Sequence, residues 1–527
     1  MAYQARSALL INPPLVKPSE PPPGIARLQG VLERNGIGCA VLDANLEGIL
    51  HLLHTPVTVR DRWTARAARN LNANLSALRH PSGYENFDRY KRSVMDLNRL
   101  LEIVSATAGV HLSLSNYRDG MLSPVRSGDL LSAAERPREN LFHSYFSRRL
   151  EGLVEEIQPS IVGFSLNYLS QALCAFAMAG FLKHRYPSLK LALGGGLVTS
   201  WMRGPAWKNP FGGLFDLVAA GPGEAPLLAF CGADPTRPEP APPDYRSLIH
   251  GRLAPGFILP YSASSGCWWN RCAFCPERAE GNPYVPVPVE RALEEIRILA
   301  GATDPVLLHL LDNAVSPKLL DVLVKNPPGA PWYGFVRITG HLTDPDFCRA
   351  LRRSGCIMLK LGLESGDQSV IDGEGKGIGI ETASLALKVL RGAGIATYVY
   401  LLFGTPSETL EKARRTLEFT ARHGDAIDFL NLAIFNMPIH GAENRDIEVT
   451  AFSEGDLSLY VGFRHPGGWN RGLVRQYLDK EFRRHPVVSA ILRRDPPFFT
   501  SNHAPFFGRS RAFGAGAPGK GTSVNPR

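Results

Sequence analysis

Short apolar runs and an amphipathic segment alternate at the start of the chain. Residues 8–12 and 39–43 are apolar runs of strand length, and the apolar positions of residues 25–35 between them have helical spacing. The alternation resumes at residue 160. A strand, a helix and a second strand in this order predict a parallel pair joined by a crossover. We therefore expect a doubly wound α/β domain over residues 1–235, with its ligand at the carboxyl ends of the strands.

Four further segments lack this alternation. Residues 48–150 are polar, rich in arginine and leucine and helical in period, which predicts a mostly helical insertion in the first domain. Residues 236–256 hold many prolines and no period, which is typical of a linker. Residues 446–507 are predicted to be helical with aromatic patches, and the Gly-, Ser- and Arg-rich residues 508–527 are predicted to be disordered.

A second alternating region covers residues 257–445. Six strand–helix repeats in this length predict an open, partial (β/α) barrel, and barrel sites lie at the carboxyl ends of the strands. The predicted strands are residues 260–264, 306–311, 334–339, 357–363, 396–403 and 429–435. The predicted helices are residues 289–300, 317–324, 345–354, 380–393 and 410–423. A cysteine-rich loop follows the first strand, so we expect it at the mouth of the barrel.

Size and charge narrow the range of partners. The chain has 527 residues, of which 44% are hydrophobic and 20% charged, as in an ordinary globular protein of two or three domains. No apolar run reaches the length of about 18 residues that a membrane span needs. No signal peptide opens the chain, so we expect a cytoplasmic protein. The net charge is +9, but the basic residues form no dense nucleic-acid-binding block. A basic face also suits an acidic electron donor, such as a flavodoxin or a ferredoxin.

Three of the eight cysteines, Cys267, Cys272 and Cys275, fall within nine residues. Three thiolates so close can hold three corners of an iron–sulfur cube and leave the fourth iron open for chemistry. A zinc site would need a fourth ligand nearby, and the nearest histidines, His250 and His309, lack ligand spacing. The other cysteines are scattered in apolar contexts, which argues against a disulfide framework. An iron–sulfur cluster is the favoured hypothesis for the three cysteines. A zinc site and a chance grouping without function are the alternatives.

The triplet, with Phe274 before its last cysteine and a partial barrel behind it, resembles the radical S-adenosylmethionine (SAM) superfamily. Its spacing departs from the family pattern, because four residues rather than three separate the first two cysteines. Residues 310–313, 361–366 and 402–409, at later strand ends, also resemble family motifs. The resemblance implies a 4Fe-4S cluster on the three cysteines and a SAM site that includes Phe274, Asp312, Arg337, Glu364 and Ser365.

Three of these SAM assignments leave an alternative open. Asp312 can instead cap the following helix. Glu364 can be a surface carboxylate, although it follows a buried strand, where a lone charge is costly. Arg337 faces the site only if the register of its strand is right.

The layout of the whole chain resembles the cobalamin-binding group of that superfamily, whose amino-terminal domain is Rossmann-like. The resemblance implies cobalamin contacts from Ser165, Leu166, Gly194, Gly195, Gly196, Gly221 and Glu224. Glycine at strand ends lets a ligand approach the backbone closely, although a plain tight turn is the alternative for each loop. No Asp-x-His-x-x-Gly motif follows the first strand, so we expect no histidine ligand on the lower face of a bound cobalamin.

The resemblance implies that one electron cleaves SAM to a 5′-deoxyadenosyl radical. The leading hypothesis that the resemblance implies is a cobalamin-dependent C-methyltransferase acting on an unactivated carbon of a small molecule or peptide. A rival is a radical SAM enzyme that does not methylate and instead catalyses a rearrangement, cyclisation or cross-link, with cobalamin absent or serving a role other than methyl transfer. A remote rival is a non-enzymatic iron–sulfur sensor. His503 is a candidate substrate contact.

Overall fold

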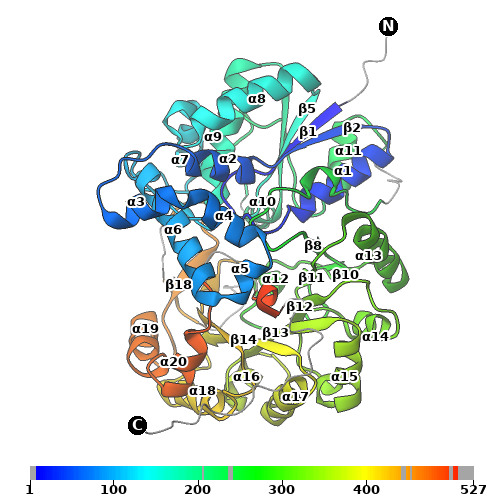
Figure 1. Ribbon diagram of the computed structural model, residues 1–527, viewed down its shortest axis with the longest axis vertical. Helices are drawn as coiled ribbons and strands as arrows, with labels where there is room; N and C mark the ends of the chain where they lie inside the picture. Colours follow the sequence, from blue (N-terminus) through cyan, green and yellow to red (C-terminus); the bar gives the residue numbers. More distant parts are fainter. Residues whose placement is uncertain are drawn as a thin grey trace, which may run out of the picture.

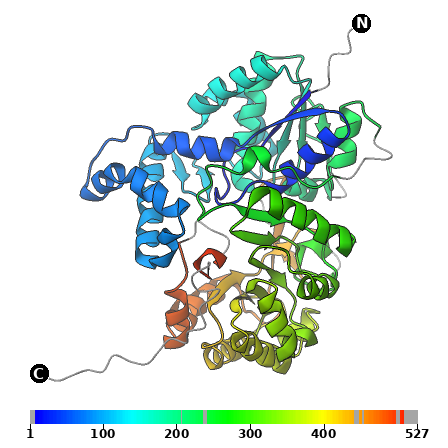
Figure 2. The same cartoon turned by 45° about the vertical axis from the view of Figure 1, so that its right-hand side comes forward.

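The structure is a computed structural model that describes residues 7–204, 207–234, 241–440, 447–450, 454–497 and 503–507. Two parallel sheets, one from each half of the chain, organise the described part. In Figure 1 the amino-terminal sheet and its helices lie above the second sheet, and the turned view in Figure 2 shows the same stacking. The α/β class predicted from the sequence is confirmed.

The amino-terminal sheet has five parallel strands in the order β2-β1-β5-β6-β7. They are β1 (Ser7–Ile11), β2 (Gly38–Leu42), β5 (Ile161–Ser165), β6 (Lys190–Gly194) and β7 (Leu217–Val218). The order reverses between β1 and β5, and such a reversal opens a ligand crevice at the carboxyl ends of the strands. The short strand β7 lies at the edge of the sheet, where it pairs with β6.

Helices cover both faces of this sheet, as its apolar strands require. One face packs against α9 (Leu169–Arg185), and the other packs against α1 (Pro23–Arg34) and α11 (Glu224–Phe230). The short helix α10 (Gly196–Met202) begins directly after β6. The proline-rich segment between β1 and α1 runs along the carboxyl end of the sheet toward the second sheet.

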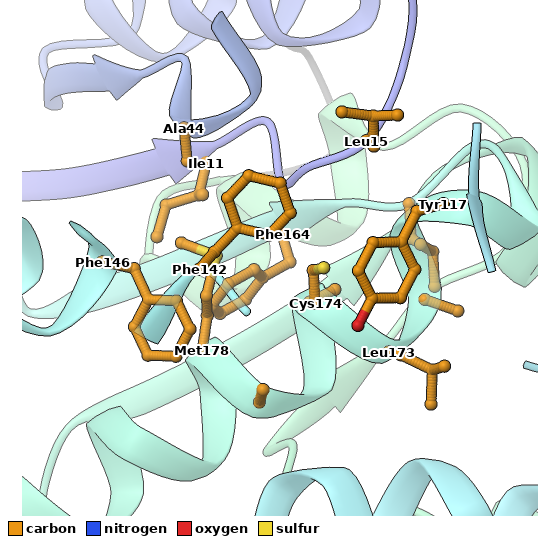
Figure 3. Close-up of a cluster of buried hydrophobic side chains, with 14 of the residues drawn as sticks. Ile11, Leu15, Ala44, Tyr117, Phe142, Phe146, Phe164, Leu173, Cys174 and Met178 are labelled. Carbon is orange, nitrogen blue, oxygen red and sulfur yellow. The ribbon is translucent and has the colours of Figure 1, made fainter. Parts of the chain in front are cut away.

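The insertion after β2 is mainly helical and shares the core of the sheet. Its elements are α2 (Ala44–Leu53), α3 (Arg62–Arg69), α4 (Leu71–Arg79), α5 (Ser82–Glu85), α6 (Phe87–Ala106), the hairpin β3 (Val110–Leu112) and β4 (Tyr117–Asp119), α7 (Ser127–Glu135) and α8 (His143–Ile157). Figure 3 shows Phe142 and Phe146 of the insertion packed with Phe164 of β5 and Met178 of α9. The insertion is therefore anchored to the sheet by apolar burial.

The second sheet is an open, partial barrel of six parallel strands in the order β8-β11-β12-β13-β14-β15. The strands are β8 (Ile258–Tyr261), β11 (Leu307–Leu310), β12 (Trp332–Val336), β13 (Cys356–Glu364), β14 (Ala396–Phe403) and β15 (Phe429–Ile434). The intervening helices are α13 (Val289–Thr303), α14 (Pro317–Lys325), α15 (Pro345–Arg353), α16 (Gln368–Gly373), α17 (Ile380–Gly392) and α18 (Leu410–Arg422). Among the described strands, β8 and β15 do not pair, so the barrel is open on one side.

Strand β13 shows how the barrel divides its side chains. Leu359, Leu361 and Leu363 pack into the core shared with the outer helices, whereas Met358 belongs to a separate cluster inside the barrel. Because side chains alternate along a strand, Lys360 also faces the lumen. This strand is buried along almost its whole length, which explains its nearly continuous apolar sequence.

The region after the barrel differs from its helical prediction. A small antiparallel sheet forms from β16 (Met437–Pro438), β17 (Val449–Thr450) and β18 (Tyr460–Phe463). The aromatic and β-branched residues of β17 and β18 favour strands. Helices α19 (Arg471–Tyr477) and α20 (Pro486–Leu492) and the short helix η6 (Ala504–Phe507) follow. Of the predicted linker, Tyr245 and Leu248 pack into the barrel core. The tail predicted to be disordered lies outside the described residues, and none of the described helices is long and apolar enough to cross a bilayer.

Candidate functional site at the facing sheet edges

The cysteine loop begins at the carboxyl end of β8 and is held at its base. The short strands β9 (Ser264–Ser265) and β10 (Val285–Pro286) pair antiparallel and close the loop. Cys267, Cys272 and Cys275 are all free thiols and partly buried. The backbone N–H of Cys275 donates to the carbonyl of Cys272 at 3.2 Å, and α12 (Pro276–Ala279) starts immediately afterwards.

The local backbone accommodates the extra residue between the first two cysteines. Asn270, between the first two cysteines, has a φ of 43°. Asparagine tolerates this left-handed conformation better than most residues do. The longer segment turns back at Asn270, and the N–H of Ala273 then donates to the carbonyl of Glu374 at 2.8 Å. The loop is thereby tied to the segment after α16.

Arg337 directly follows the end of β12 and lies beside the cysteine loop. Its guanidinium stacks on the Trp269 ring at 3.6 Å from the centroid. It also donates to the carbonyls of Lys376 and Gly377, the second at 2.8 Å. The indole N–H of Trp269 donates to the carbonyl of Gly375 at 3.1 Å. Trp269 and Arg337 together lock the cysteine loop onto the barrel mouth.

Glu364 ends β13 in an ion pair rather than as a free surface carboxylate. Its Oε1 accepts from Nζ of Lys376 at 2.8 Å, and both side chains are largely buried. The backbone of Glu364 has a φ of 68°, next to a register shift in the pairing of β13 with β14. A Cβ added at Gly362 would lie 2.6 Å from that Oε1. Glycine at this position therefore leaves room for the pair to lie over the strand.

Asp312 is buried and binds the start of the cysteine loop. Its carboxylate accepts from the N–H of Ala263 at 3.1 Å and from the hydroxyl of Ser264 at 2.5 Å. Burial raises the pKa of Asp312 above its ordinary value, and these donors oppose that rise. The alternative that Asp312 caps the next helix is wrong, because the Ser316 hydroxyl accepts from the N–H of Leu319 there.

The other two residues predicted to contact SAM are Ser365 and Phe274, which differ in burial. The hydroxyl of Ser365, which is fully buried, pairs with Thr416 Oγ1 at 3.0 Å and accepts from the N–H of Asp367 at 3.1 Å. Ser365 thus joins the end of β13 to α18. Phe274 packs against the cluster of Phe435 and Met437, and Nζ of Lys376 lies 5.6 Å from its ring.

The thiols lie in an environment where burial and positive charge act in opposite directions. Burial raises the pKa of Cys272, and the charges of Lys376 and Arg337 oppose that rise. Burial raises the pKa of Cys275 to about 11, and the N–H groups of Glu277 and Arg278 oppose it. Thiolates are the metal-binding form, so nearby positive charge favours metal binding. Within the described residues, no three His, Cys, Asp or Glu side chains are grouped as ligands of one metal ion. A cube, in contrast, takes each thiolate at a different iron.

A cavity of about 970 Å³ separates the two facing sheet edges. The amino-terminal sheet lines it mainly with backbone and small side chains, and the barrel contributes the base of the cysteine loop. Six of the seven residues predicted to bind cobalamin line this cavity: Ser165, Gly194, Gly195, Gly196, Gly221 and Glu224. Leu166 does not. It is buried behind the loop, where its N–H donates to the carbonyl of Gly194 at 2.7 Å.

Two lining residues were missed in the sequence because their role is to hold the glycine loops. Asn167 Oδ1 accepts from the N–H of Gly196 at 2.9 Å, and Thr199 Oγ1 accepts from the N–H of Gly221 at 2.9 Å. Both are short polar residues next to a glycine loop, which is a weak sequence signal. No histidine is present among the described residues that line the cavity.

Residues 261–420 match the family model of the radical SAM superfamily. The chain carries a radical SAM domain. Two solved structures share the wider fold at low sequence identity. One is the cobalamin-dependent SAM radical enzyme OxsB with aqua-cobalamin bound, at a TM-score of 0.51 and 14% identity, covering 80% of this chain and 53% of that one. The other is the radical SAM methyltransferase TsrM of Kitasatospora setae, at 0.50 and 17%, covering 82% and 74%.

Two curated proteins are also similar in sequence. The anaerobic magnesium-protoporphyrin IX monomethyl ester cyclase of Rubrivivax gelatinosus is 25% identical over 230 residues, which are 42% of this chain and 41% of the cyclase. An uncharacterized methyltransferase of Pyrococcus horikoshii is 24% identical over 166 residues, 30% of this chain and 36% of that protein. The matches therefore span well under half of the curated relatives.

Proposed function

We propose that this radical SAM enzyme is a cobalamin-dependent C-methyltransferase acting on an unactivated carbon of a small molecule or peptide. The observation that carries the proposal is the cavity of about 970 Å³ between a glycine-lined sheet edge and the cysteine loop. This volume is near the upper end of typical ligand pockets and suits a large, flat cofactor. The two solved structures with the same fold are named as a cobalamin-dependent enzyme and a methyltransferase.

The residues present fit both implied groups. Cys267, Cys272 and Cys275 would hold a 4Fe-4S cluster, and Arg337 and Lys376 would offset the negative charge of the thiolates. The cofactors supply single-electron cleavage of SAM and a methyl group for transfer. The protein orients them: Trp269 and Arg337 fix the cysteine loop, and Asp312 fixes its first residues. The loops at residues 194–196 and at Gly221 present backbone to the cavity, and none of the described lining residues is a histidine that could bind a cobalt.

A second candidate is a radical SAM enzyme that does not methylate. It is favoured by the likeness to a protein named as a cyclase, over a longer segment than the likeness to a methyltransferase. The two candidates share the cluster and SAM and differ in the use of the cavity. An iron–sulfur sensor would need neither the ordered barrel mouth nor the cavity.

The test is anaerobic reconstitution with iron, sulfide, SAM and dithionite, followed by chromatography for 5′-deoxyadenosine. The wild type should release it, and Cys272→Ala should lose at least about 99% of the release, because three thiolates are needed to hold the cube. Cys39→Ala is the matched control, since Cys39 is a partly buried thiol in the other domain. Equal release from Cys272→Ala would overturn the cluster assignment.

A titration with hydroxocobalamin, followed by absorbance, tests whether the second cofactor that the methyltransferase requires is bound. Stoichiometric binding by the wild-type chain supports the methyltransferase. A protein that binds none at saturating ligand supports the non-methylating enzyme instead.

A further inference from the structure

The cysteine loop carries a buried polar group that the candidate site does not use, the indole N–H of Trp268. Trp268 directly follows Cys267, the first of the three cysteines. The residue as a whole is only partly buried, but its Nε1 is buried and has no hydrogen-bond partner among the described residues. A tryptophan near a surface ordinarily turns its apolar ring to the protein and its N–H to water. In Trp268 the N–H is the part that is turned inward.

Other indole N–H groups in the described part of the chain donate to a protein acceptor. They belong to Trp63, Trp269, Trp332 and Trp469. A buried N–H without an acceptor is rare and costly. Phenylalanine would fill much of the same space without leaving such a group. Packing alone therefore does not account for a tryptophan at position 268.

Trp201 and His503 also have a buried nitrogen without a partner among the described residues, but in different surroundings. The ring of Trp201 packs in the amino-terminal domain, with its centroid 6.1 Å from that of Phe211. His503, the candidate substrate contact, packs inside the barrel, where its ring lies 4.2 Å from that of Tyr398 and 4.4 Å from that of Phe429. Of these three residues, Trp268 is the one that adjoins a cysteine of the loop.

Contacts of the neighbouring residue place Trp268 beside the thiols. The ring of Trp268 lies 6.1 Å from that of Trp269, at an angle of 80°. Trp269 in turn stacks with the guanidinium of Arg337 at 3.6 Å. Arg337 interacts electrostatically with the thiols of Cys272 and Cys267. The two indole rings and Arg337 therefore lie next to one another on the side of the loop that carries these thiols.

The backbone that carries Trp268 is fixed on both sides. Before it, β9 pairs with β10, and a Cβ added at Gly266 would lie 2.3 Å from the carbonyl oxygen of Pro283. After it, the indole N–H of Trp269 donates to the carbonyl of Gly375 at 3.1 Å, and Asn270 turns the chain with a φ of 43°. A donor on a fixed segment is oriented before its acceptor binds, as the residues of a functional site are.

The large cavity does not supply the acceptor. Gly266, Pro276 and Glu277 of this segment line the cavity of about 970 Å³, and Trp268 does not. Because Nε1 is also buried, neither bulk water nor the cavity reaches it. The acceptors closest to Trp268 along the chain are the sulfur of Cys267 and the sulfurs of the cluster that the three thiolates would hold. Such sulfurs accept hydrogen bonds from N–H groups.

We propose that the indole N–H of Trp268 donates a hydrogen bond to a sulfur of the 4Fe-4S cluster and thereby raises its reduction potential. The inference rests on the cluster assignment of the proposed function and names a residue that tunes the cluster. Hydrogen bonds to the sulfurs are among the factors that set such a potential. Reduction adds one negative charge to the cluster, so a donor stabilises the reduced state more than the oxidised state. A higher potential makes it easier to deliver the one electron that SAM cleavage needs.

The test is a redox titration of the reconstituted full chain without SAM, with dithionite as the electron donor and electron paramagnetic resonance as the readout. Trp268→Phe keeps an aromatic ring and removes the N–H. The variant should bind as much iron and sulfide as the wild type. Its equilibrium constant for one-electron reduction should fall by at least about tenfold, which lowers the midpoint potential by at least about 59 mV. Trp201→Phe, which removes a buried N–H in the other domain, should leave the potential unchanged.

A second measurement is made on the wild type and does not depend on the folding of a variant. Pulsed electron paramagnetic resonance of the reduced chain, with nitrogen-15 in its indole rings, should show a hyperfine coupling from an indole nitrogen. Trp268→Phe should lose this coupling, and Trp201→Phe should keep it. If Trp268 only packs the loop, Trp268→Phe should lower the melting temperature and leave the potential unchanged, and the wild type should show no indole coupling.

Three results would overturn the inference: an unchanged potential in Trp268→Phe with a full complement of iron, no indole coupling in the wild type, or a coupling that persists in Trp268→Phe. None of these measurements depends on SAM cleavage. A wild-type chain that binds no iron and sulfide would overturn the proposed function and this inference with it. A bound cluster with any of the three results would count against Trp268 alone.

Discussion

The carboxyl ends of the two sheets are built in opposite ways. The amino-terminal sheet presents glycine loops and short polar residues, and its hydrogen bonds there run largely between side chains and backbone of neighbouring loops. The barrel presents thiols, an arginine and a buried ion pair, each held by a specific partner. Both edges are carboxyl ends of parallel strands, so fold geometry alone does not explain the contrast.

The difference reflects what each edge is suited to hold. A large flat ligand needs a smooth surface, and removing Cβ atoms provides it. A small charged ligand and a metal cluster need side chains with fixed charge and orientation. Substitutions at one sheet edge should therefore weaken the binding of its own ligand and leave the binding at the other edge unchanged.

The largest expected effect is on the barrel edge. Cys267→Ala should lose iron and sulfide to background levels, because two thiolates cannot hold the cube. Its affinity for hydroxocobalamin should stay within about twofold of wild type, since distant sites act independently. Iron analysis and an absorbance titration on the same sample measure both. Loss of both cofactors together would show that the edges form one cooperative unit.

The next largest effect concerns the backbone of the glycine edge, which is the carboxyl end of the amino-terminal sheet with its loops at residues 194–196 and 221. Gly195 has a φ of 116°, and an added Cβ would lie 2.4 Å from the carbonyl oxygen of Leu166. Gly195→Ala should therefore destabilise the chain by about 3 kcal/mol, from backbone strain and overpacking. Chemical denaturation followed by circular dichroism measures it. Gly152→Ala, inside α8 with no atom near the added Cβ, should instead stabilise by about 0.5–1 kcal/mol. Equal effects of the two changes would contradict the strained geometry of the loop.

Part of the fold and of the candidate site can be predicted from the sequence. The barrel was predictable because parallel strands buried on both faces are continuous apolar runs, and β13 is such a run. The cysteine loop and the glycine edge were predictable because their spacing has a direct chemical meaning. Lys360 was visible as a lone charge within that apolar strand, but its partners Glu20 and His309 come from distant segments that only the fold brings together.

Other features depend on local geometry that spacing does not encode. The register shift between Gly362 and Glu364 sends Glu364 toward Lys376, while the hydroxyl of Ser365 turns to Thr416. The sequence predicts helix where β16, β17 and β18 form, because two- to four-residue strands carry too little period to identify. A cobalamin contact is predicted for Leu166 from its place in a motif, but this residue follows β5 directly and is buried, with its N–H bonded to the carbonyl of Gly194.

A smaller effect tests how the barrel keeps charged groups buried. Glu408 is 1% exposed, and burial raises its pKa to about 7 despite bonds from the N–H of Gly404 and the indole N–H of Trp469. The folded state thus holds a proton that the unfolded state releases near pH 4.5. Stability is lost as pH rises from about 4.5 to about 7.

Glu408→Gln removes this titration and keeps an acceptor for both donors. The variant should gain about 2 kcal/mol relative to wild type between pH 5 and pH 8. Denaturation midpoints at the two pH values measure the gain. An equal difference at both values would mean that Glu408 is charged in the folded barrel.

The smallest effect returns to the glycine edge as a binding surface. Gly196 lines the cavity, and a Cβ added there would meet only Asn167 Oδ1, at 3.6 Å. Gly196→Leu should therefore fold normally but fill part of the cavity, and weaken hydroxocobalamin binding by about tenfold, or about 1.4 kcal/mol. Its iron content should equal that of wild type. Gly213→Leu, at an exposed glycine with no atom near its added Cβ, is the control and should change neither quantity. Unchanged affinity in Gly196→Leu would show that the smooth edge is not where the large ligand lies, and the contrast between the two edges would then reflect folding rather than binding.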